Sequence, residues 1–295
     1  MKKFTYCAFI LILAGFLSCA SSPGKVQTGS SVWKVSRNGN TVFLGGSIHV
    51  LRNEDFPLPG EFDRAFSQST MLTLETDVEQ LADEDVVQYL AMRMFLPAGT
   101  TLKTILNTDT YDILKSKLEE YRVPIEGDIS RLKPSMIMNV LAMLEIQRYG
   151  FVEQGVDLHY LEKAKEAKKP VDFLETVQAQ IDMIVTMGDG YENDFVKYSL
   201  NDMGNTENEL ASIVSEWKTG AAASTEKTLL EMRGQWPVIY KTTIADRNAA
   251  WLPKIHGYLE SGSRVFIITG LAHLHGPDGL LRQLADSGCT VTQFK

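Results

Sequence analysis

The chain has 295 residues, of which 44% are hydrophobic and 22% are charged. This length and balance are typical of a globular protein that buries a sizeable core as one large domain or two small ones. The formal net charge is −8. An acidic chain without a basic run containing interleaved aromatic residues is a poor binder of nucleic acid, so we expect no nucleic-acid partner.

The first residues have the pattern of a targeting segment. Two lysines precede an apolar run over residues 6–16, which has the length of a signal-peptide core and is short for a transmembrane helix. The Leu-Ser-Cys sequence that ends at Cys19 looks like a bacterial lipobox. We therefore expect residues 1–18 to be a signal peptide, Cys19 to carry lipid, and residues 19–31 to form a flexible tether to the cell envelope. The alternative is ordinary secretion with an incidental cysteine.

From residue 32 onward, apolar runs that suit strands alternate with segments of helical pattern. The dipeptide Asn38-Gly39 between the first two runs predicts a hairpin. The predicted strands cover residues 32–36, 41–44, 71–77, 170–176, 264–269 and 290–294. The predicted helices cover residues 60–68, 84–95, 109–121, 134–149, 155–169, 181–234 with breaks near 189 and 220, a segment opened by Pro237, and 277–287.

The order strand, turn, helix, strand is the rhythm of an α/β fold. We expect residues 32–295 to form one α/β domain, with a mixed central sheet flanked by helices and a helical region over residues 79–169. Two predicted strands end in the same Leu-Glu-Thr sequence, at Glu75 and at Glu175. This repetition suggests tandem, internally duplicated α/β units, although the lengths between the repeats are too irregular to prove it.

Two histidines follow predicted strands in the same context. The apolar run of residues 42–44 is expected to break at Gly45-Gly46, and His49 follows Gly46 by three residues. Near the other end of the chain, Gly270 closes the strand of residues 264–269 and His273 follows it by three residues. Since α/β sheets place their sites just past the carboxyl ends of strands, both Gly-x-x-His turns are candidate site elements.

The residue types at these strand ends suit a metal centre. Two imidazoles and one carboxylate, from His49, His273 and Glu75, are a ligand set known for catalytic zinc and also suitable for manganese, cobalt or iron. Such a metal would polarise a carbonyl and activate water. Glu175 is a second candidate ligand or a general base. Each histidine taken alone is equally compatible with a hydrogen-bonded core residue.

Arg247 interrupts the apolar stripe of the helix that follows Pro237. A charged group on an apolar face needs a partner, because burying it alone is costly. Arg247 is therefore a candidate for the site, where it would neutralise developing negative charge. The alternative is an arginine that extends from the helix edge into solvent.

At these positions the sequence resembles the TraB/GumN family, which includes the TIKI proteins. The resemblance covers nearly the whole chain after the tether. It rests on Leu44–Val50 with Pro57-Leu58-Pro59, on Leu72–Asp77, on Leu174-Glu175-Thr176, on Asp246-Arg247-Asn248, and on Gly270–Leu274 with Gly276–Leu280.

The resemblance implies a tandem α/β fold and a metal-dependent protease, since TIKI proteins are described as metalloproteases that cleave secreted proteins. His49, His273 and Glu75 would then be metal ligands, and Glu75, Arg247 and Glu175 catalytic. The second motif departs slightly from bacterial relatives at Leu271-Ala272. We expect an exported, lipid-anchored hydrolase that acts on a peptide or protein substrate with manganese, cobalt or zinc. The rivals are a non-catalytic haem- or iron-binding envelope lipoprotein and a scaffold used only for partner contacts.

Overall fold

The computed structural model describes residues 29–152, 154–203 and 206–295. These residues divide into two compact units. A helical unit comprises residues 77–150 and 176–206, and a sheet unit comprises residues 29–76, 151–175 and 207–295. The expected signal peptide and the lipidated Cys19 lie outside the described residues.

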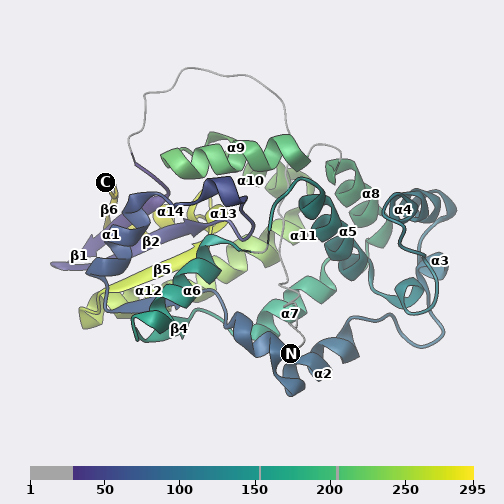
Figure 1. The fold of residues 1–295 in the computed structure, drawn as a ribbon, viewed down its shortest axis with the longest axis horizontal. Coiled ribbons are helices and arrows are strands. Elements are labelled where there is room, and N and C mark those ends of the chain that lie inside the picture. The colour runs from purple at the N-terminus through teal and green to yellow at the C-terminus, as the bar shows by residue number, and fades with distance from the viewer. Residues whose placement is uncertain (1–28, 153, 204–205) are drawn as a thin grey trace. The chain divides into compact units, whose positions relative to one another are not determined.

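The sheet unit contains one six-stranded mixed sheet, as predicted (Figure 1). Its spatial order is β4-β3-β5-β2-β1-β6. β4, β3, β5 and β2 pair in parallel, whereas β1 pairs antiparallel with both β2 and β6. The carboxyl ends of the four parallel strands therefore lie along one edge of the sheet. The strands are β1 (Val32–Arg37), β2 (Asn40–Ser47), β3 (Met71–Leu74), β4 (Val171–Phe173), β5 (Val265–Gly270) and β6 (Thr290–Gln293).

The predicted hairpin joins β1 to β2. Arg37 pairs with Asn40, and the two residues between them have positive φ, 51° at Asn38 and 85° at Gly39. Two positive φ angles in a two-residue loop are the geometry that Asn-Gly accommodates best, which explains why these residues turn the chain here.

Helices cover both faces of this sheet. On one face, Leu44 and Ile267 pack against Trp251 of α12 and against α14. On the other face, Phe266 contacts the Phe62 ring, which also contacts Trp217. This alternation along the strands is the reason for the layered α/β arrangement. The helices of the unit are α1 (Gly60–Gln68), α6 (Val156–Glu166), α9 (Thr206–Thr219), α10 (Ala223–Gln235), α11 (Pro237–Tyr240), α12 (Asp246–Ser261), α13 (Leu271–Leu274) and α14 (Leu280–Asp286).

One local expectation is wrong, because the strand does not break at Gly45-Gly46. β2 runs through both glycines to Ser47. A Cβ on Gly45 would lie 2.8 Å from a ring carbon of Phe266, and one on Gly46 would lie 2.7 Å from a methyl carbon of Leu271. The two glycines therefore allow close packing against the sheet rather than a turn in the chain.

The helical unit comprises α2 (Glu84–Arg93), α3 (Leu102–Ile105), α4 (Thr108–Glu120), α5 (Pro134–Arg148), α7 (Val177–Thr186) and α8 (Glu192–Asp202). The buried side chains of α5 include Ile137 and Leu141. α6 belongs to the sheet unit, whereas α7 and α8 belong to the helical unit. In the described part of the chain, none of the helices has the length and apolar character that crossing a membrane requires. The internal duplication stays a prediction.

Candidate functional site

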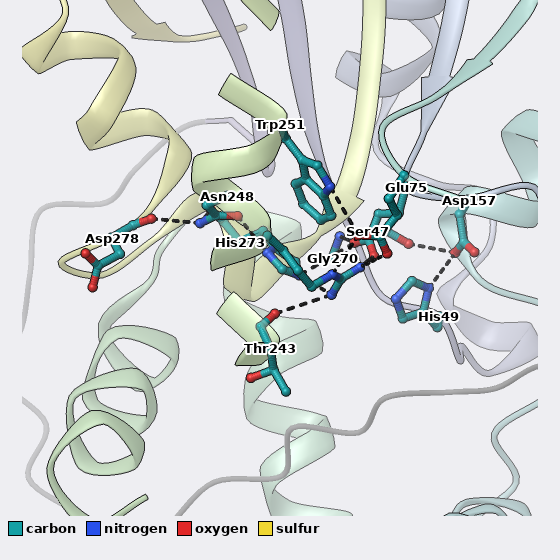
Figure 2. Close-up of polar contacts among 12 residues, drawn as sticks. Ser47, His49, Glu75, Asp157, Thr243, Asn248, Trp251, Gly270, His273 and Asp278 are labelled. Carbon is teal, nitrogen blue, oxygen red and sulfur yellow. Dashed lines mark hydrogen bonds and ion pairs between the residues drawn. The ribbon is translucent and has the colours of Figure 1, made fainter. Parts of the chain in front are cut away.

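Four of the candidate residues come from neighbouring strand ends. His49 follows β2, Glu75 follows β3, Glu175 follows β4, and His273 lies in the short helix α13 that follows β5. Since these four strands are parallel, their ends carry all four side chains to one edge of the sheet. Figure 2 shows three of them, His49, Glu75 and His273.

The two histidines and Glu75 surround one point beside Gly270. A Cβ placed on Gly270 would lie 3.3 Å from Glu75 Oε1, 3.5 Å from His273 Cδ2 and 3.7 Å from His49 Nε2. The backbone N–H of Gly270 also donates to Glu75 Oε1 at 2.5 Å. A glycine is needed here because any larger residue would place its side chain between the three groups.

The His49 ring is held from behind by α6. His49 Nδ1 lies 3.1 Å from Asp157 Oδ1, and Ser47 Oγ donates to the same oxygen at 2.7 Å. Gly155 brings the start of α6 against the His49 backbone, where a Cβ would lie 2.5 Å from His49 Cα. Because a carboxylate only accepts hydrogen bonds, Nδ1 carries a proton, and Nε2 faces the site.

Asp157 also sets the charge of His49. Burial alone would lower the pKa of the imidazole, but the nearby Asp157 carboxylate outweighs burial and raises it from 6.5 to about 9. The pKa of Asp157 is lowered by the same pairing, although burial opposes this shift. At neutral pH His49 and Asp157 therefore form an ion pair, and 29% of the His49 side chain is exposed. We call this pair the exposed corner of the site.

The His273 ring is held from behind by Asn248 of α12. Asn248 Nδ2 donates to His273 O at 3.0 Å and to Asp278 O at 2.7 Å. The amide oxygen of Asn248 must therefore face His273 Nδ1, 2.7 Å away, and accept a hydrogen bond from its N–H. His273 is thus in the tautomer that leaves Nε2 as an unprotonated acceptor aimed into the site.

Arg247 occupies the space between the two glutamates. Its guanidinium donates to Glu175 from Nε at 3.1 Å and from Nη2 at 2.8 Å, and Nη2 also lies 2.5 Å from Glu75 Oε2. Nη1 lies 2.9 Å from His273 Nε2. The Arg247 side chain is only 9% exposed, and the carboxylates of Glu75 and Glu175 are the partners that such a buried charge needs. A π-helical turn over Lys241–Ala245 immediately precedes α12, and such turns often mark functional sites.

These contacts shift the pKa values of the buried groups around Arg247. Burial would raise the pKa of Glu75, but the charge of Arg247, together with the charge of His49 and the hydrogen bond from Gly270 N–H, lowers it to about 2. Burial lowers the pKa of His273 to about 3, and the Arg247 charge adds to this effect. Burial raises the pKa of Glu175, although Arg247 opposes it. Glu75 is therefore ionised and His273 neutral at neutral pH.

Comparison with known proteins identifies the family of the chain. A sequence profile of the TraB/PrgY/gumN family matches residues 31–293. The chain belongs to the TraB/PrgY/gumN family. The matched range contains both Gly-x-x-His elements and both glutamates, and the predicted family is confirmed.

Relatives in this family include both bacterial and animal proteins. The chain is 26% identical over 250 residues to the uncharacterized protein YbaP of Escherichia coli, covering 83% of this chain and 89% of YbaP. It is 26% identical over 193 residues to the human metalloprotease TIKI1, covering 56% of this chain and 37% of TIKI1, and similarly to TIKI1 of Danio rerio. No solved structure matches.

The donors of this TraB/PrgY/gumN chain fit a divalent transition metal in kind and in orientation. Both rings are held through Nδ1 by a second group and turn Nε2 inward, as metal-ligating histidines do. In the arrangement described, however, Arg247 Nη1 engages His273 Nε2. Within residues 29–152, 154–203 and 206–295, no group of three or more His, Cys, Asp or Glu side chains is arranged to hold a metal ion.

The sequence located some of these residues and missed others. The structure brings His49, His273, Glu75, Glu175 and Arg247 together, and their roles stay predictions. Sequence reasoning missed Asp157, Ser47, Gly155 and Asn248 as supporting groups. Two further histidines, His159 and His275, contact aromatic rings rather than the site residues. His275 is buried, with 8% of its surface exposed.

Proposed function

We propose that this TraB/PrgY/gumN protein is a hydrolase of peptide bonds that uses a divalent transition metal. The observation that carries the proposal is the convergence of His49, His273 and Glu75 around Gly270. The name of the distant relative TIKI1, a metalloprotease, supports the reaction class. Fold alone would not, since unrelated activities share α/β folds.

His49, Glu75 and His273 would hold the metal, with His49 releasing its Nε2 proton as the metal binds. Manganese, cobalt and zinc all accept this nitrogen and oxygen donor set. When bound, the metal would polarise the scissile carbonyl and lower the pKa of a bound water.

The chain's own residues supply orientation and charge. Asp157 and Asn248 fix the two rings through Nδ1, so that both Nε2 atoms face the substrate side of Gly270. Glu175, whose pKa is raised by burial, would act as the general base. Arg247 places a permanent positive charge beside both glutamates, where it would stabilise negative charge on a tetrahedral intermediate.

We further propose that the protein is exported and anchored to the cell envelope by lipid on Cys19, with residues 19–31 as the tether. A peptide or protein substrate would then reach the site at the membrane surface, and nucleic acid has no part in the function. Mass spectrometry of the mature amino terminus, purified from membranes, tests this proposal. A free, unmodified amino terminus at any other residue would contradict it.

Cleavage of a peptide library tests the activity. The full chain, purified without a histidine tag, should cleave peptides when manganese, cobalt or zinc is added, and Glu75→Gln should abolish cleavage. Glu260→Gln is the matched control, because Glu260 is an exposed carboxylate at the far end of α12 and should leave cleavage unchanged.

Failure of cleavage with every metal, for a folded protein, would contradict the proposal. A Soret band on haem titration of that inactive protein would favour the binding lipoprotein instead. The absence of both cleavage and haem binding would leave the scaffold.

A further inference from the structure

Two different sets of contacts hold the guanidinium of Arg247. One set leaves the histidine nitrogens free: a fork of two hydrogen bonds to Glu175, and the ring of Trp251, whose centroid is 4.6 Å from Arg247 Cζ and which also packs against the His273 ring. The other set lies inside the site, where Nη1 contacts His273 Nε2 and Nη2 contacts Glu75 Oε2. The first set can retain the side chain when the second set is released.

The second set uses atoms that a metal would need. Asn248 accepts a hydrogen bond from the Nδ1–H of His273, so Nε2 of this neutral ring has a single lone pair and no proton. That lone pair accepts a hydrogen bond from Arg247. One lone pair cannot both accept an N–H and coordinate a metal ion, so the guanidinium and a metal are alternative occupants of His273 Nε2.

We propose that Arg247 is a placeholder cation, which a divalent metal displaces from His273 and Glu75 and which then stays on Glu175 and Trp251. This inference rests on the proposed metal dependence. It explains how Glu75, only 9% exposed, is tolerated without a metal, since an unpaired buried carboxylate is costly. It also explains why Arg247 has a second carboxylate and an aromatic face beside it.

Displacement has a measurable consequence for metal affinity. The apparent affinity is reduced by the fraction of molecules in which Arg247 has withdrawn. A variant that lacks the guanidinium leaves His273 Nε2 and Glu75 open to the metal and should bind it more tightly. A residue that only supported the metal ligands would have the opposite effect, because its loss would weaken binding.

Cobalt titration tests the proposal. The full chain in detergent, without a histidine tag, is titrated with Co²⁺, and binding is followed by the visible absorption of the bound ion and by calorimetry. We expect Arg247→Gln to bind about 10-fold or more tightly than the unchanged protein, at the same one-to-one stoichiometry. Arg247→Gln/Glu175→Gln should also bind more tightly, and it keeps the test available if the single variant fails to fold. Lys241→Gln removes an exposed cation near the start of α12 and should bind like the unchanged protein.

The outcomes separate this inference from the proposed function. Unchanged or weaker Co²⁺ binding by the folded Arg247 variants would overturn the placeholder, even if the unchanged protein cleaves peptides. Tighter binding without peptide cleavage by any form would support the placeholder and contradict the hydrolase. Absence of Co²⁺ binding in every form would overturn both.

Discussion

His49 and His273 follow neighbouring parallel strands, each three residues after a glycine, and yet their surroundings give one a positive charge and leave the other neutral. Asp157 faces Nδ1 of His49 and keeps that ring protonated, with a pKa of about 9. The neutral amide of Asn248 faces Nδ1 of His273. Burial, together with the Arg247 charge, lowers the pKa of His273 to about 3. The repeated Gly-x-x-His motif therefore determines where each imidazole lies, whereas the group that contacts Nδ1, Asp157 or Asn248, determines whether the ring is protonated.

The two corners also differ in exposure. The His49 corner is partly exposed and rests on a helix start, while the His273 corner is closed by a buried network of Arg247 and two glutamates. We expect the largest effects on stability at the buried corner and the largest effects of pH at the exposed one.

The buried corner should be the more sensitive to loss of charge. Arg247→Ala leaves Glu75 and Glu175 side by side without a cation, and breaking a buried ion pair by removing one partner costs about 3–5 kcal/mol. Chemical denaturation should show this fall in the free energy of unfolding. Lys241→Ala, which removes an exposed pair with Asp246, should change it by less than about 1 kcal/mol. Equal effects of the two substitutions would mean that the Arg247 network is not buried.

Asn248 should control the tautomer of His273. Asn248→Leu removes the acceptor of the His273 Nδ1–H and the donor to His273 O, while Asp278 O keeps its hydrogen bond from Gln283, so we expect a loss of about 1–3 kcal/mol of stability. Nitrogen-15 NMR of the imidazole should show an unprotonated Nε2 in the unchanged protein and a mixture of tautomers in the variant. Gln283→Leu also loses a bond to Asp278 O, but should leave the His273 signals in place. A protonated Nε2 in the unchanged protein would contradict this assignment.

The exposed corner should respond to alkaline pH. The pKa of His49 is raised in the folded state, so its stabilising effect is fully present below about pH 6.5 and is lost as the pH rises through about 9. Asp157→Asn should lower the free energy of unfolding by about 1.5–3 kcal/mol near pH 6, because a hydrogen bond to a charged group is lost. The difference between the two proteins should shrink towards pH 10. A difference that grows with pH would show that His49 is neutral when folded.

The buried corner, which contains Glu75 and His273, should lose stability at acid pH rather than at alkaline pH. Glu75 has a lowered pKa, so the stability that it contributes is present above about pH 4.5 and is lost as the pH falls through about 2. The pKa of His273 is also lowered, so stability falls with pH from about 6.5 to about 3 as the unfolded chain takes up a proton. Glu75→Gln should flatten the lowest part of this profile. A profile with the same slope in both proteins would contradict the lowered pKa of Glu75.

The smallest effect on stability is expected for a substitution of Gly270, which lies between His49 and His273. Gly270 has a φ of −50°, which alanine tolerates, but the added methyl would lie 3.3 Å from Glu75 Oε1. Gly270→Ala should therefore fold and lose most of its Co²⁺ binding and peptide cleavage. Gly257→Ala on α12 meets no neighbouring atom and should raise the stability by about 0.5–1 kcal/mol with normal binding. Normal binding by both variants would place the site elsewhere.

The sequence predicted the residues whose position follows from strand ends. His49, His273, Glu75 and Glu175 each follow a predicted strand, and parallel pairing then brings them to one edge. Arg247 was detectable because it interrupts an apolar stripe.

The supporting groups carry no such signal in the sequence. Asp157 lies in the first turn of α6 and reaches His49 only through tertiary packing, which Gly155 permits. The role of Asn248 depends on where two distant carbonyls lie, and spacing cannot reveal this. The prediction that the strand breaks at Gly45-Gly46 was wrong for the same reason. The ring and methyl carbons that require glycine there belong to other elements and cannot be seen in the local sequence.

A double-variant cycle for peptide cleavage tests most directly whether the two imidazoles act in one site. Cleavage rates are measured for the unchanged protein, His49→Ala, His273→Ala and the double variant, each with added metal. If both rings serve one centre, each single variant loses nearly all activity and the double variant loses no more than either single one. Independent effects that multiply in the double variant, or wild-type cleavage by either single variant, would contradict the shared site.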